Sequence, residues 1–317
     1  IMAIYKDILI FTIGIIVIIK SADLFTTGAE SIAIAFKIPR VVIGVTIVSL
    51  ATTTPELTVS AISSYIGAGG MAVGNALGSC LANIGLILAT AAIIKPIKFN
   101  PKTLKQEIPF LILVIFILYL LLADKRLSLA EGLLLCLLQG LFFTHIVLRE
   151  LRARRKNEVD KPLYYNIKKD AVKFLIGAVG VVGAAKYAIV PSSINIAHFL
   201  KVPEIVIGLT IVAVGTSLPE LFTAVIASLK NMGELAAGNV IGANILNILL
   251  VLGVSASMKP LNVDMQTVMF TVPAVIFITV LMFLFCRTKL ELTRKEGLAL
   301  LGIYAGYIFY ILKFAYC

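Results

Sequence analysis

Long apolar segments alternate with short polar segments along the whole chain. Most apolar segments have about 20 residues, which is enough for a helix to cross a hydrocarbon core of about 30 Å. The first and sixth are longer, as in tilted or kinked helices. The pattern predicts ten membrane-spanning helices with the approximate bounds 5–35, 40–66, 71–94, 106–123, 128–148, 170–200, 203–229, 235–258, 266–286 and 296–314.

The composition agrees with this pattern. Of the 317 residues, 60% are hydrophobic and only 14% are charged, and the mean hydropathy is +1.02. Soluble domains carry about 25% charged residues. We therefore expect an all-α polytopic membrane protein without a soluble domain.

Basic residues give the chain a net charge of +11, and they gather between the predicted helices. Placing the basic segment 151–169 in the cytoplasm gives the cytoplasmic loops 19 Lys and Arg residues and the opposite side 6. Such a bias sets membrane orientation. It favours contacts with lipid headgroups over nucleic-acid binding. It predicts a multi-pass protein of the cell membrane with both termini outside.

The chain contains an internal repeat. Pro39–Leu88 aligns without a gap on Pro203–Leu252, and 22 of the 50 positions are identical. The repeat divides the chain into a first five-helix half, 1–150, and a second, 170–317, joined by the segment 151–169. Because five is an odd number, the halves must enter the membrane from opposite sides, which predicts an inverted-topology repeat.

Each half carries the same polar motif inside an apolar helix. Residues 51–56 read ATTTPE and residues 215–220 read GTSLPE. A charge at mid-membrane costs roughly 2.5–3.5 kcal/mol, so Glu56 and Glu220 are functional candidates. The prolines should also free the carbonyls of Ala51 and Gly215, because proline has no backbone N–H.

The third helix of each half adds amides and hydroxyls to these carboxylates. These positions, at helical spacing, are Asn75, Ser79 and Asn83, matched by Asn239, Ala243 and Asn247. Hard oxygen donors suit Na⁺ or Ca²⁺, and two facing carboxylates are neutralised by one Ca²⁺, by two Na⁺ or by protons. The alternative structural interpretation is a pair of protonated glutamates bonded to helix backbones.

In these motifs the chain resembles the cation/calcium exchanger superfamily, and within it the prokaryotic sodium/calcium exchangers. The resemblance implies a secondary antiporter that exchanges Ca²⁺ for Na⁺ by alternating access, with the first and sixth helices sliding across the other eight. Ca²⁺ would be held by Glu56, Glu220 and the carbonyls of Thr52 and Thr216. The implied Na⁺ sites use these glutamates together with Ser49, Thr53, Ser79, Ala213, Thr216 and Ser217. We include Asn83 and Asn247 among the metal-site candidates.

Two departures from the family pattern leave the counter-ion open. Ala243 stands where several relatives carry serine, which removes a hydroxyl from an outer Na⁺ site. Asn247 replaces an aspartate that accompanies K⁺ dependence and so argues against K⁺ co-transport. An H⁺/Ca²⁺ exchanger is therefore an alternative, although the Pro-Glu form of the motif is not typical of that branch.

Other classes fit less well. A cation channel lined by the carboxylates is a distant alternative, since an inverted repeat is not a ring of identical helices. An enzyme is not expected, because His145 and His198 are isolated and form no metal-ligand motif. We predict no cofactor and no obligate protein partner. Asp23 and Glu30 have no acidic counterparts in the second half, and the sequence assigns them no role.

Overall fold

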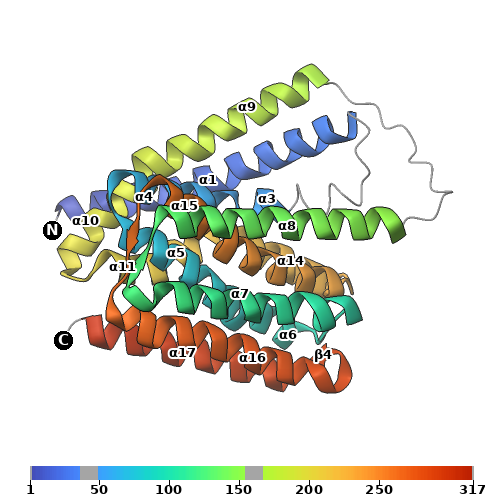
Figure 1. The fold of residues 1–317 in the computed structure, drawn as a ribbon. Coiled ribbons are helices and arrows are strands. Elements are labelled where there is room, and N and C mark those ends of the chain that lie inside the picture. Colours follow the sequence, from blue (N-terminus) through green and yellow to red (C-terminus); the bar gives the residue numbers. More distant parts are fainter. Residues whose placement is uncertain (1, 36–48, 154–166, 316–317) are drawn as a thin grey trace.

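The long helices of the protein lie side by side in one bundle. The computed structural model describes residues 2–35, 49–153 and 167–315. The start of α1 (Met2–Ala35) and the end of α17 (Arg294–Ala315) lie at one end of the bundle, here called the terminal end (Figure 1). The end of α8 (Leu129–Ala153) and the start of α9 (Ile167–Ala184) lie at the opposite end, the linker end.

The bundle is that of a multi-span membrane protein. In the part of the chain that the structure describes, eight helices are long and apolar enough to cross a membrane. A ninth candidate is the pair Glu204–Thr216 and Leu218–Leu229, which is bent by 46°. The predicted span 40–66 begins outside the described residues and continues in α3 (Ser49–Thr52) and α4 (Thr54–Ile66). The number ten therefore stays a prediction.

The third helix of each predicted half forms the centre of the bundle. In an apolar 18-residue window of each of these two spans, 78% of the residues are buried, against 22–39% in the same kind of window of the other six candidate spans. Both contain a π-helical segment. Their elements are α5 (Gly69–Ala82), η2 (Asn83–Leu88) and α6 (Ala89–Ile94), and α14 (Gly233–Leu246), η7 (Asn247–Val251) and α15 (Leu252–Met258).

Proline shapes several of the remaining spans. The π segments η3 (Thr103–Glu107), η5 (Ala185–Ile189) and η8 (Thr267–Thr271) each end one or two residues before a proline, whose missing N–H disturbs the α-helical ladder. The other elements are α7 (Ile108–Leu121), η4 (Leu122–Asp124), α10 (Val190–Leu200), α11 (Glu204–Ile207), η6 (Gly208–Val212), α12 (Ala213–Thr216), α13 (Leu218–Leu229) and α16 (Val272–Lys289).

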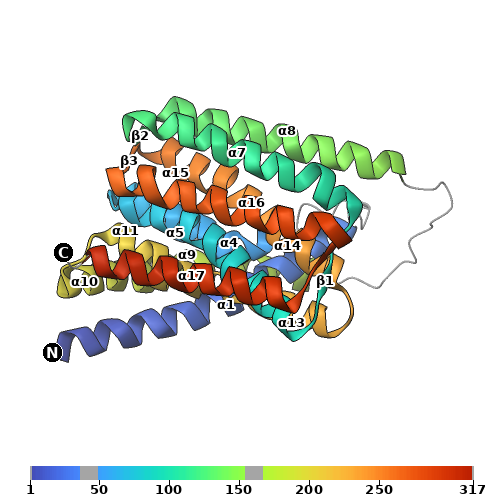
Figure 2. The same cartoon turned by 90° about the horizontal axis from the view of Figure 1, so that it is seen from below.

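Short strands, which the sequence did not predict, join the halves at both ends. β1 (Ile97–Lys98) pairs antiparallel with β4 (Glu291–Leu292), and β2 (Arg126–Leu127) pairs with β3 (Leu261–Asn262). The β2–β3 pair lies at the terminal end, and β1 lies at the linker end (Figure 2). Each pair therefore ties one predicted half to the other.

The same local devices occur at matching places in the two halves. α8 begins with a capping box in which Ser128 N and Oγ both donate to Glu131 Oε2 at 2.7 Å. α17 begins with the same box, formed by Thr293 and Glu296 at the same distances. Such boxes satisfy backbone N–H groups that have no partner within the helix. They also give the two helices a common register.

Two serine bonds between the halves are reciprocal. Ser64 Oγ donates to the Ser255 carbonyl at 2.6 Å, and Ser228 Oγ donates to the Ala91 carbonyl at 3.1 Å. Ser228 follows Ser64, and Ser255 follows Ala91, by the same 164 residues that separate the sequence repeats. Each bond is thus the counterpart of the other.

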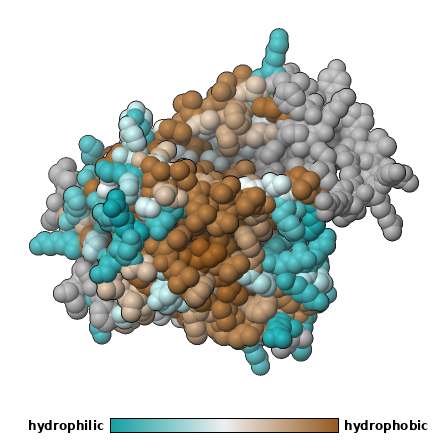
Figure 3. Space-filling model, viewed as in Figure 1, coloured by the Kyte–Doolittle hydropathy of each residue, from teal (hydrophilic) through white to brown (hydrophobic). Residues whose placement is uncertain are grey.

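The surface matches a membrane environment. Figure 3 shows hydrophobic residues across the middle of the bundle and hydrophilic residues towards its two ends. Large apolar side chains such as Leu113 and Leu137 are 53% and 59% exposed. An apolar band of this kind is what a span facing lipid presents.

Candidate functional site

Both motifs interrupt a helix immediately before a glutamate. Thr53 separates α3 from α4 and Ser217 separates α12 from α13, with nearly equal backbone angles (φ −84°, ψ 0° and φ −87°, ψ 8°). Pro55 and Pro219 occupy the second helical position after each break. Because proline provides no N–H, the chain can break here at little additional cost.

The two glutamates that follow the breaks are buried. Glu56 and Glu220 are each 1% exposed and stand in the first turn of α4 and α13. Their carboxylates are close enough to interact electrostatically. Two buried like charges at short range repel each other unless a cation or protons neutralise them.

A chain of hydroxyls connects Glu56 to the other half. Ser217 Oγ donates to Glu56 Oε1 at 2.9 Å, and the same hydroxyl lies 3.1 Å from Ser79 Oγ. Thr216 also lies beside Glu56, and Thr52 lies beside Glu220. The motif of each half therefore approaches the carboxylate of the other half.

Asn75 holds the break region of both halves together. Its Nδ2 donates to the Glu56 carbonyl at 3.2 Å and to Ser60 Oγ at 2.9 Å. Its Oδ1 accepts a bond from the Thr216 hydroxyl at 3.1 Å. Asn75 is fully buried, so these bonds fix the position of α5 against both interrupted helices.

Glycines allow the close helix approach that Asn75 requires. A Cβ atom on Gly74 would lie 3.0 Å from the Gly208 Cα, and one on Gly208 would lie 3.0 Å from the Gly74 Cα. A Cβ on Gly78 would lie 2.7 Å from the Leu209 Cα. Glycines thus allow α5 and η6 to cross at short distance, whereas a Cβ on Gly238 in α14 would meet nothing within 4 Å.

A second polar cluster lies about two turns beyond Asn75 along the third helices. Asn83 Nδ2 donates to Asn244 Oδ1 at 2.8 Å, and Asn244 Nδ2 donates to the Cys80 carbonyl at 3.2 Å. Asn247 lies beside the Cys80 side chain. Sequence comparison of the halves did not single out Asn244, because its counterpart in the first half is Cys80. The signal that could have identified Asn244 is an amide flanked on both sides by apolar residues within a predicted span.

Four oxygen acceptors around the glutamates have no hydrogen-bond partner among the described residues. They are Glu56 Oε2, Glu220 Oε2, Asn83 Oδ1 and Asn247 Oδ1, each on a residue that is 1% exposed. Buried acceptors are normally satisfied. Because all four are oxygens on residues predicted to bind a metal, the set has the chemistry of a site for a hard cation.

The remaining predicted residues lie in α3, α12 and α14 or at the two helix breaks. Thr53 and Ser217, at the two breaks, are 1% exposed, and Ala213 is fully buried with its carbonyl accepting the Ser217 N–H at 3.1 Å. Ala243 is buried in α14. Ser49 begins α3, and its side chain lies outside the described residues.

Asp23 takes no part in the described site. Asp23 is exposed on α1, and the Glu30 side chain is not among those described. Within the described residues, no group of three or more His, Cys, Asp or Glu side chains is placed to hold a metal. The candidate site thus depends on two carboxylates complemented by neutral oxygens.

Comparison with known proteins adds an independent line of evidence. The family model for the sodium/calcium exchanger protein matches residues 6–148 and 170–313. The chain is 37% identical to the putative antiporter CaxA of Alkalimonas amylolytica, over 93% of this chain and 95% of that protein. It is 31% identical to the sodium/calcium exchanger MaX1 of Methanosarcina acetivorans, over 96% and 99% of the two chains.

Solved structures give the same result for the fold. The sodium-calcium exchanger NCX_Mj, soaked with 2.5 mM Na⁺ and 10 mM Sr²⁺, matches with a TM-score of 0.68 and 30% sequence identity. The match covers 96% of this chain and 98% of that one. The likeness therefore extends over nearly the whole bundle.

Proposed function

Because the chain belongs to the sodium/calcium exchanger protein family, we propose that it is a secondary antiporter that exchanges Ca²⁺ for Na⁺ across the membrane. The family consists of transporters rather than enzymes. The observation that carries the proposal is the set of four buried oxygens without partners, Glu56 Oε2, Glu220 Oε2, Asn83 Oδ1 and Asn247 Oδ1. Two come from each half.

Charge balance explains why one site can exchange two kinds of ion. Glu56 and Glu220 together carry two negative charges when ionised, and both are 1% exposed. One Ca²⁺ neutralises them, and so do two monovalent cations. Because burying an uncompensated charge is costly, Ca²⁺ and the counter-ion occupy the carboxylates alternately. Binding that is mutually exclusive in this way is the basis of antiport.

We also infer an inverted repeat of two five-helix halves. It is supported by the reciprocal bonds of Ser64 and Ser228 and by the two capping boxes. The pairing of β1 with β4 and of β2 with β3 is also what an exchange of the two halves would produce. Such a repeat places the cation site where the halves meet, at the broken helices.

The proposed orientation has the linker end in the cytoplasm of a cell-membrane protein. The start of α1 and the end of α17 share the terminal end (Figure 1). The basic residues favour the linker side by 19 to 6. Both termini are then outside, in accordance with the preference of Lys and Arg for the cytoplasmic side.

Proton exchange is the second candidate, and one residue favours it. In the proposed repeat Ala243 is the counterpart of Ser79, whose hydroxyl lies 3.1 Å from that of Ser217. The half that contains Ala243 lacks this hydroxyl, and with it one neutral oxygen for a Na⁺ ion. Protons need no such ligand, since they bind the carboxylates directly.

Transport by purified protein in vesicles tests both candidates. Vesicles that contain Na⁺ should take up Ca²⁺ when diluted into Na⁺-free buffer, and a protonophore should leave this uptake unchanged. If Ca²⁺ uptake follows a pH gradient and does not depend on Na⁺, the counter-ion is H⁺ and not Na⁺. Ca²⁺ flux without any counter-ion gradient, at the rate of an open pore, would contradict antiport itself.

A further inference from the structure

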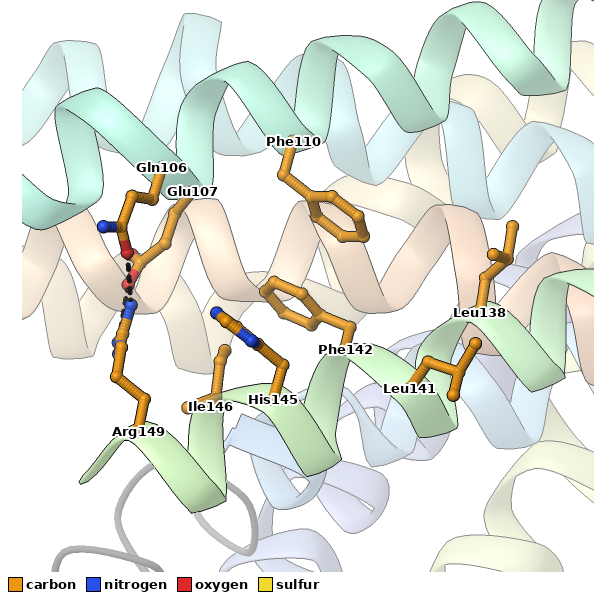
Figure 4. A pocket seen from close by; sticks show the side chains of 9 residues that line it. All are labelled: Gln106, Glu107, Phe110, Leu138, Leu141, Phe142, His145, Ile146 and Arg149. Atoms are coloured by element: carbon orange, nitrogen blue, oxygen red, sulfur yellow. Dashed lines mark hydrogen bonds and ion pairs between the residues drawn. The ribbon is translucent and has the colours of Figure 1, made fainter. Parts of the chain in front are cut away.

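A groove between α7 and α8 lies at the linker end, and neither Glu56 nor Glu220 lines it. It has a volume of about 330 Å³, within the range of small-ligand pockets. Figure 4 shows Phe110, Phe142, Leu138 and Leu141 along its length, and Arg149 at its polar end. Leu141 is 59% exposed, so the groove opens on the lipid-facing side of the two helices.

The polar end of the groove is built around Arg149. Its Nη1 donates to Gln106 Oε1 at 2.9 Å, and its Nη2 lies 3.5 Å from Glu107 Oε1. Thr103 Oγ1 donates to the other Glu107 oxygen at 2.9 Å. These contacts hold the guanidinium at the mouth of the groove, where the side chain keeps 22% exposure. Lys105, which is exposed in η3 next to Gln106, adds a second positive charge.

The corresponding place in the other half is filled. Phe142 and Tyr307 each stand eleven residues after the capping-box glutamate of their helix. His145 and Tyr310 each stand fourteen residues after it. In the α16–α17 pair, the Phe270 ring lies 3.8 Å from that of Tyr310 and 5.9 Å from that of Tyr307. Three aromatic rings thus occupy the space between these helices.

The α7–α8 pair lacks two of these rings. Gln106 takes the place of Phe270 in the π segment, and His145 takes the place of Tyr310. This pair has instead a stack of Phe110, the counterpart of Ala274, on Phe142 at 4.4 Å. An apolar groove with Arg149 at its mouth therefore lies between α7 and α8, whereas rings pack between α16 and α17.

We propose that this groove binds an anionic phospholipid. The acyl chain lies between Phe142, Leu138 and Leu141, and the phosphate lies beside Arg149. The apolar walls suit a hydrocarbon tail. At the mouth, the two cations Arg149 and Lys105 outnumber the single carboxylate of Glu107, which suits a negative head. Basic pockets between spans at the cytoplasmic end are typical sites for anionic headgroups, and the linker end is the one we place in the cytoplasm.

Native mass spectrometry of the delipidated protein in detergent micelles tests the proposal. The probes are phosphatidylglycerol and phosphatidylcholine with the same acyl chains. We expect one phosphatidylglycerol to be retained about tenfold better than phosphatidylcholine, because a charged hydrogen bond to phosphate adds to tail binding. Equal retention of the two lipids would overturn the proposal.

Variants locate the site. Arg149→Gln should abolish the preference for phosphatidylglycerol. Lys289→Gln, which removes a charge from the exposed end of α16 outside the groove, should keep it. His145→Tyr introduces the residue that α17 has at this register, Tyr310, and keeps the Arg149 contacts. Because the larger ring should fill the groove, this variant should not retain the lipid. It decides the test if Arg149→Gln does not fold. Wild-type retention by His145→Tyr would contradict the proposal, whatever the ion exchange activity.

Discussion

The surroundings of Glu56 and Glu220 match each other in most respects and differ at one point. Each glutamate follows a helix break, is 1% exposed, and lies beside a threonine of the opposite motif. Beside Glu56, however, Ser217 leads on to the hydroxyl of Ser79, whereas Ala243 has a methyl group at the corresponding position. The repeat therefore conserves the charges and the amides while one flank loses a neutral ligand.

Under the proposed function, this difference separates two tasks of the site. Ca²⁺ would need the two carboxylates together, so its binding would depend on what the halves share. A monovalent ion on one flank would depend on the neutral oxygens of that flank, which the halves do not share. The comparison predicts that substitutions at shared positions have equal effects in both halves, and that substitutions at the unshared position do not.

The largest effects are expected at the carboxylates. Glu56→Gln and Glu220→Gln should each lower Ca²⁺ exchange at least about hundredfold, because each removes a charged ligand from a buried divalent ion. Vesicle uptake measures the loss. Ca²⁺ should also raise the Tm of the wild type but not of these variants.

Glu234→Gln is the matched control. Glu234 is exposed at the start of α14, where Asn100 Nδ2 donates to its Oε2 at 3.2 Å. It undergoes the same change of carboxylate to amide outside the site. Full activity of either Glu56→Gln or Glu220→Gln would mean that the cation is held elsewhere.

The two asparagines come next. Asn83→Leu and Asn247→Leu keep the side-chain size and remove the oxygens Asn83 Oδ1 and Asn247 Oδ1. Each should weaken Ca²⁺ binding roughly tenfold, through loss of a ligand or of its orientation. Titration of the Ca²⁺-dependent Tm shift measures the change. A wild-type titration for both variants would restrict the site to the motif residues.

Smaller and opposite effects are expected at the unshared position. Ser79→Ala should reduce the apparent affinity for Na⁺ about fivefold, which corresponds to one hydrogen-bonding ligand of about 1 kcal/mol. Ala243→Ser should increase it. Ca²⁺ release at graded Na⁺ concentrations compares the two. Equal Na⁺ dependence in both variants and the wild type would show that this hydroxyl does not bind Na⁺, and would favour protons as the counter-ion.

The smallest effects should fall on the reciprocal serines. Ser64→Ala and Ser228→Ala each remove a buried bond to a carbonyl of the opposite half. Each should cost about 1 kcal/mol of unfolding free energy, by similar amounts and without a change in ion affinity. Thermal unfolding in micelles measures the pair, and markedly unequal losses would argue against equivalent contacts.

The sequence was sufficient for eight of the ten predicted spans, for the two motifs and for the positions of the glutamates. Apolar runs determine spans because lipid offers no hydrogen bonds to the backbone, and Glu56 was evident because a carboxylate in such a run is costly. The expected helix breaks lie at Thr53 and Ser217, next to the prolines. The metal role of these residues stays a prediction.

Only the tertiary structure decided which side chains meet. Ser217 bonds Glu56 and Asn244 bonds Asn83, each across 161 residues of sequence. Periodicity gives the face on which a residue lies, but not the rotation and height at which two helices pack. For the same reason, the sequence did not predict the groove at Arg149 or the cluster of rings at Phe270. Each depends on side chains from two helices that become neighbours only in the fold.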